Sequence, residues 1–117
     1  MSGGASEAGD APVEYHLLLD AEEVPVAASA LRLLIADEAH EPEIRAIARG
    51  ALTLLDEPAD ERGLLRIGLT APEMKITHSA VRLLINDSQR EQAEEREILW
   101  RIVGKLPDEH VMRAIVL

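Results

Sequence analysis

Hydrophobic and polar residues alternate along two short stretches of the chain, residues 13–19 and 63–69, and a third short apolar run at 111–117 resembles the second. In the second stretch, for example, Leu65 and Ile67 are separated by Arg66. A period of two over about seven residues is typical of a strand with one buried face. The alternation predicts strands at the first two stretches, and the resemblance predicts a third.

A helix start follows each of the first two stretches. Asp20 with Glu23, and Thr70 with Glu73, have the spacing of a capping box, in which an oxygen side chain precedes a glutamate by three residues. Two helical patterns follow each start, and only a few polar residues interrupt them. Such short connections indicate antiparallel helix hairpins.

The two halves of the chain resemble each other. Residues 17–37 and 67–87 are 50 positions apart and agree at 10 of 21 positions, including "SALRLLI" and "SAVRLLI". Self-similarity at a fixed period predicts repeated structural units. We assign the two units to residues 13–62 and 63–117.

These patterns predict an α+β fold with a tandem βαα repeat, in the order βαα-βαα-β. A small sheet is covered by two antiparallel helix hairpins, as two-layer packing requires. The alternative is an all-α four-helix bundle in which the alternating stretches are helix ends or extended arms. Residues 13–117 form a single domain, and residues 1–12, which are rich in Gly, Ala and Ser, form a disordered tail.

The repeated helix is apolar on two sides, with a polar stripe between them that consists of Lys75, Ser79, Arg82 and Asn86 in the second copy. Such a helix lies either in the centre of the monomer or partly in an interface. Trp100 lies beside the apolar face of its helix and either covers the core edge or anchors a partner. The candidate interface residues, including two on the open sheet face, are Trp100, Ile76, Leu83, Val26, Leu33, His16 and Arg66.

The formal net charge of −10 limits which classes of macromolecule the protein can bind. A phosphate backbone requires a basic surface, so nucleic acid is excluded as a partner. Residues 1–57 carry a net charge of −9, from 12 acidic and 3 basic side chains, whereas residues 58–117 carry −1, from 10 and 9. Either this difference is ordinary surface variation, or the halves attract each other or a second chain.

The sequence contains no recognisable catalytic or metal-binding motif. Cysteine is absent, and the four histidines have no spacing typical of zinc ligands. Phosphate-loop, dinucleotide and EF-hand patterns are also missing, so we expect no catalytic residue, no cofactor and no metal. Without a membrane-length apolar run or a secretory signal, the expected location is the cytoplasm.

One pair of residues in the repeated helix has a chemical interpretation. Ser29 and Arg32, and again Ser79 and Arg82, are three residues apart and so share a helix surface. Each arginine either pairs with a neighbouring acid or, with His78 nearby, holds an anion or a partner's carboxylate.

Three hypotheses for function follow. The first is a non-enzymatic protein that acts through self-association, as a homodimer, and through protein–protein interaction. The second is an acidic regulator, of the antitoxin or anti-activator type, that binds a basic protein partner. The third is binding of a small molecule or anion at the interface between the repeats.

Overall fold

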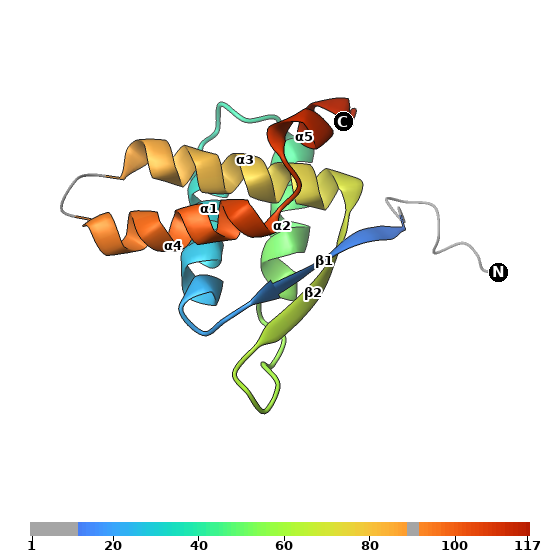
Figure 1. The fold of residues 1–117 in the computed structure, drawn as a ribbon. Coiled ribbons are helices and arrows are strands. Elements are labelled where there is room, and N and C mark those ends of the chain that lie inside the picture. Colours follow the sequence, from blue (N-terminus) through green and yellow to red (C-terminus); the bar gives the residue numbers. More distant parts are fainter. Residues whose placement is uncertain (1–11, 89–91) are drawn as a thin grey trace.

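The computed structural model describes residues 12–88 and 92–117. Within this part the chain is a small α+β domain with a two-stranded antiparallel sheet and five helices (Figure 1). The elements in chain order are β1 Val13–Leu19, α1 Glu23–Ala36, α2 Pro42–Leu54, β2 Leu65–Thr70, α3 Ala71–Asp87, α4 Ala93–Lys105 and α5 Glu109–Ala114. The predicted α+β class and the first two predicted strands are confirmed.

The alternation of each strand matches the burial of its side chains. β1 pairs with β2 so that Leu17 lies opposite Ile67 and Leu18 lies opposite Arg66. Leu17 and Ile67 are buried, whereas Leu18 and Arg66 are exposed. One face of the sheet therefore packs on the protein interior and the other face is open.

The helices enclose an aliphatic core. Figure 1 shows α3 and α4 side by side, with α1 and α2 passing behind them, and α1 packs against both α2 and α3. The core contains no aromatic side chain and is built from leucine, isoleucine, valine, alanine and methionine. Tyr15 packs only against its edge.

The hydrogen bonds of both predicted capping boxes are present, but only the Thr70–Glu73 pair stands at a helix N-cap, because α1 begins at Glu23 and its N-cap is Glu22. The Thr70 hydroxyl accepts the Glu73 N–H at 3.2 Å, and the Glu73 carboxylate accepts the Thr70 N–H at 3.0 Å. Asp20 and Glu23 exchange the same two hydrogen bonds, at 2.9 and 2.8 Å. The hydrogen bond from the Glu23 N–H, and after it the bond from the Glu22 N–H, hold the pKa of Asp20 below its ordinary value, and the positive charge of Arg101 lowers it further.

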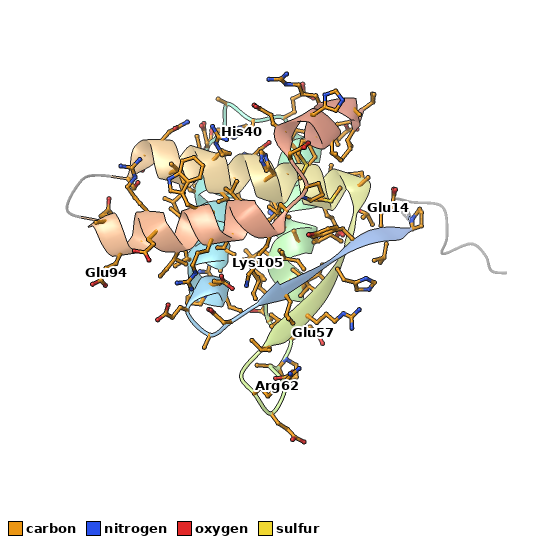
Figure 2. All side chains as sticks on the ribbon, viewed as in Figure 1. Glu14, His40, Glu57, Arg62, Glu94 and Lys105 are labelled. Carbon is orange, nitrogen blue, oxygen red and sulfur yellow. The ribbon has the colours of Figure 1, made fainter. Side chains whose placement is uncertain are left out.

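Glu23 has a second role that Glu73 lacks. Its carboxylate is 1% exposed and accepts hydrogen bonds from Lys105 Nζ at 2.5 Å and Arg101 Nε at 3.4 Å. Figure 2 shows Lys105 where the end of α4 approaches β1. The two cations compensate a buried negative charge and join the end of α4 to the start of α1.

Two parts of the predicted fold are wrong. The third predicted strand, at 111–117, is absent because Glu109–Ala114 forms helix α5. The Asp108 side chain accepts the Val111 N–H at 3.0 Å, and this N-cap favours a helix over a strand. The all-α alternative is also wrong, because β1 and β2 pair.

The predicted tail lies almost entirely outside the described residues, and the duplication of the chain stays a prediction. None of the helices in the described part combines the length and the apolar character needed to cross a lipid bilayer.

We predict that Glu23→Gln destabilises the protein more than Glu73→Gln does. Glutamine can still close either capping box, but only at position 23 does it remove the charge that compensates two cations. Because Lys105 and Arg101 are more than a third exposed, the expected excess loss in unfolding free energy is only about 1–3 kcal/mol. Urea unfolding of both variants measures this difference, and equal losses would contradict the role assigned to the Glu23 charge.

Candidate functional site

A groove between α3 and α5 contains three of the five residues predicted to contact an anion. Its volume is about 400 Å³. One face of α3 lines the groove with Lys75, His78, Ser79, Arg82, Leu83 and Asn86. These positions recur every three or four residues, as expected for one face of a helix, and they include the whole predicted polar stripe. Helix α5 adds Glu109, Met112 and Arg113.

The groove is positively charged on a strongly acidic protein. Three cationic side chains, Lys75, Arg82 and Arg113, line it with the single carboxylate of Glu109. The lining therefore carries a net charge of +2, from three positive and one negative group, on a chain whose net charge is −10. This contrast makes the groove a local site for a negative group.

His78 is the most deeply buried ionisable residue of the groove. It is 7% exposed, and no hydrogen bond reaches its ring from the described residues. Burial lowers the pKa of His78, and the charge of Arg82 lowers it further, whereas Glu109 acts in the opposite direction. At neutral pH the ring is uncharged and offers one N–H donor and one nitrogen acceptor.

Arg82 lies between the groove and Trp100. The Cζ atom of Arg82 is 5.4 Å from the centre of the Trp100 ring, a distance at which a cation is attracted to the aromatic face. Its Nε atom is buried and has no hydrogen-bond partner in the described part of the chain. The aromatic contact lies on one face of the guanidinium group and leaves its in-plane N–H groups available to the oxygens of an anion.

The structure separates the two predicted Ser–Arg pairs. Ser79 and Arg82 line the groove, whereas Ser29 and Arg32 are exposed on α1 and do not line it. The two arginines therefore do not share this groove.

The predicted interface residues are found in three different environments. Trp100 is 47% exposed, and His16 and Arg66 are exposed on the open sheet face. Ile76 is 3% exposed and belongs to the core of the single chain. The half-buried residues that pack against the core are Val26, Leu33 and Leu83.

Sequence reasoning missed Glu109 and Arg113 as groove residues. Both lie on α5, which overlaps the third predicted strand. The signal for a helix was local: Asp108 follows Pro107 and is an N-cap residue type. Only the packing of α5 on α3 then brings the two side chains to the groove.

The groove offers hydrogen-bond donors and positive charge for a bound anion. Within residues 12–88 and 92–117, no three His, Asp or Glu side chains come together as a ligand set for a metal ion. The chain matches no family model, no curated protein and no solved structure.

We predict that His78 makes the protein less stable as the pH falls. Its pKa is below 6.5 in the folded chain and near 6.5 in the unfolded chain, so below about pH 6.5 the unfolded state binds more protons. The free energy of unfolding should therefore decrease on acidification more steeply for the wild type than for His78→Gln. Denaturant unfolding between pH 5 and 8 provides the comparison, and parallel pH profiles would refute it.

Proposed function

We propose that this protein is a non-enzymatic interaction protein that self-associates into a homodimer through the outer edge of β2. The observation that carries the proposal is a difference between the two edges of the sheet. The end of α4 forms hydrogen bonds with β1 at its outer edge, whereas no such bond from the described residues reaches the outer edge of β2. A free strand edge is a template for another strand.

The end of α4 blocks the edge of β1. Lys105 Nζ donates a hydrogen bond to the Leu18 carbonyl at 2.9 Å. The Tyr15 hydroxyl donates to the carbonyl of Lys105 itself. These contacts occupy backbone and space that an added strand would need.

The backbone of β2 is open by comparison. In the described part of the chain, residues 65–69 take part in no recorded backbone hydrogen bond except the pairing with β1. The β2 strand of a second copy would extend the sheet to four strands across a twofold axis. Because each β1 edge is closed, the association would stop at two copies and would not continue into a fibre.

The open face of the sheet adds apolar surface to this edge. Val13 is 53% exposed and Leu18 is 43% exposed. Val13 lies over Gly68, where a Cβ atom would approach Val13 Cγ1 to 2.9 Å. In a dimer centred on Ile67, Arg66 of one copy would lie opposite Gly68 of the other, which keeps the two Arg66 charges apart.

We also propose that the two halves are copies related by a local twofold axis. In support, Leu17 and Ile67 are 50 positions apart in the sequence and are also partners in the sheet register. An antiparallel pairing in which equivalent residues face each other is the arrangement that a twofold axis between two copies produces. The equivalent helices α1 and α3 also pack together.

We propose, as a second function, that the protein regulates a basic partner protein. Exposed negative charge around α2 supports this proposal. Acidic side chains at the start of α2 and in the preceding loop are exposed at Asp37, Glu38, Glu41 and Glu43. Further acids are exposed beyond the end of α2. Such surfaces accelerate association with a cationic protein, and added salt weakens the attraction.

We predict a dimer by light scattering coupled to size-exclusion chromatography at concentrations on the order of 10–100 μM. Amide hydrogen exchange in residues 65–69 should slow as the protein concentration rises, because the second copy protects the edge. A monomer across this range, or exchange independent of concentration, would contradict the proposal.

Arg66→Pro should separate dimerisation from folding. The Leu18 carbonyl is directed to Lys105, away from β2, so its partner Arg66 has an N–H that points to the free edge. Proline removes this N–H and is tolerated at such an edge position. We expect a folded monomer by circular dichroism and light scattering, while the control Arg66→Ala keeps the N–H and stays dimeric.

A further inference from the structure

We propose that the groove between α3 and α5 binds the phosphate group of a small phosphorylated molecule. The groove is distinct from the β2 edge, so this inference does not depend on self-association. It rests on the charge of the groove, on polar groups that lack partners, and on the size and lining of the space.

The charge of the groove matches a phosphate monoester, which carries between one and two negative charges at neutral pH. Lys75, Arg82 and Arg113 face one carboxylate, that of Glu109. Glu109 Oε2 lies 3.5 Å from Arg113 Nη2, so the most exposed cation is partly neutralised. Two cations, Lys75 and Arg82, remain for the ligand.

Several donors in the groove lack a partner within the protein. His78 lines the groove and is 7% exposed as a residue, and its ring forms no hydrogen bond with the described residues. Arg82 Nε is buried without a partner, although the guanidinium group stacks on Trp100. Lys75 Nζ donates one hydrogen bond, to the Ile115 carbonyl at 2.5 Å, and retains two N–H groups.

Unsatisfied polar groups at a buried position are costly, and a bound oxyanion with several acceptor oxygens satisfies them together. The Ser79 hydroxyl and the Asn86 amide line the same groove and supply further donors. Charge-assisted hydrogen bonds from lysine and arginine to phosphate are stronger than bonds between neutral groups.

The space is larger than a phosphate ion requires. A volume of about 400 Å³ is within the range of pockets that hold organic ligands. Met112 is buried and Leu83 is half-buried, and both line the groove beside the donors. They provide apolar surface for the organic part of the ligand, and the Glu109 carboxylate disfavours a second anionic group there.

The first half of the chain lacks this site and supplies its control. Ala28 and Pro25 occupy the positions that correspond to His78 and Lys75 in the 50-residue comparison. Arg32 corresponds to Arg82, but it is exposed on α1 and does not line the groove. Arg32→Gln therefore removes the same charge from the protein without touching the groove.

Trp100 reports binding directly, because it is the only tryptophan in the chain and Arg82 lies over its ring. The experiment titrates the full chain with inorganic phosphate and with glycerol phosphate at constant ionic strength, and follows Trp100 fluorescence and the heat of binding. We expect both to saturate, and glycerol phosphate to bind more tightly because it also contacts the apolar lining.

Arg82→Gln should weaken binding about tenfold or more by calorimetry, because it removes a charged donor. His78→Ala should also weaken binding while leaving the Arg82–Trp100 contact in place, and Arg32→Gln should leave the affinity unchanged. Circular dichroism of each variant verifies the fold, and a variant that fails to fold is replaced by Ser79→Ala, with Ser29→Ala as its control.

Three results would overturn the proposal. One is the absence of saturable binding of either phosphate compound to the wild type. A second is an equal loss of affinity in Arg82→Gln and Arg32→Gln, which would indicate general charge attraction. The third is equal affinity for acetate or succinate, or binding only to vesicles that contain phosphatidic acid, which would reject a small phosphorylated ligand.

Discussion

The buried carboxylate of Glu23 is the interaction on which the arrangement of the molecule depends. It accepts hydrogen bonds from the Asp20 backbone, from Arg101 and from Lys105, and so joins the start of α1 to the end of α4. A charge this deeply buried is tolerated only when cations and donors surround it. The position of α4 relative to β1 is therefore constrained by electrostatics as well as by apolar packing.

Two surfaces follow from the position of α4. At its end, Lys105 covers the Leu18 carbonyl and closes the outer edge of β1, which leaves β2 as the open edge of the sheet. Near its middle, Trp100 stacks against Arg82 on α3 and holds the guanidinium group beside the groove. Different parts of α4 thus shape the two surfaces: its end closes the edge of β1, and its middle lies beside an arginine of the groove.

Local patterns in the sequence predicted the features that depend on neighbouring residues. The alternation at 13–19 and 63–69 predicted β1 and β2, and Thr70 with Glu73 predicted the capping box of α3. The sequence also predicted the polar stripe on α3, because its residues recur every three or four positions and so share one face of a helix. The strand prediction failed at 111–117, where the N-cap at Asp108 starts a helix in an apolar run that resembles the second strand.

The sequence by itself determined the α+β class, the helix starts and the donors on one face of α3, because each depends on residues within about one or two helical turns of one another. The tertiary structure decided which donors act together. Arg32 and Arg82 have the same local sequence, yet only Arg82 meets α5 and Trp100. Likewise, Glu23 and Glu73 make the same local pair of hydrogen bonds, with Asp20 and Thr70, but only Glu23 receives Lys105 from 82 residues away. Such differences arise from contacts between distant segments, and the local periodicity of a sequence does not predict these contacts.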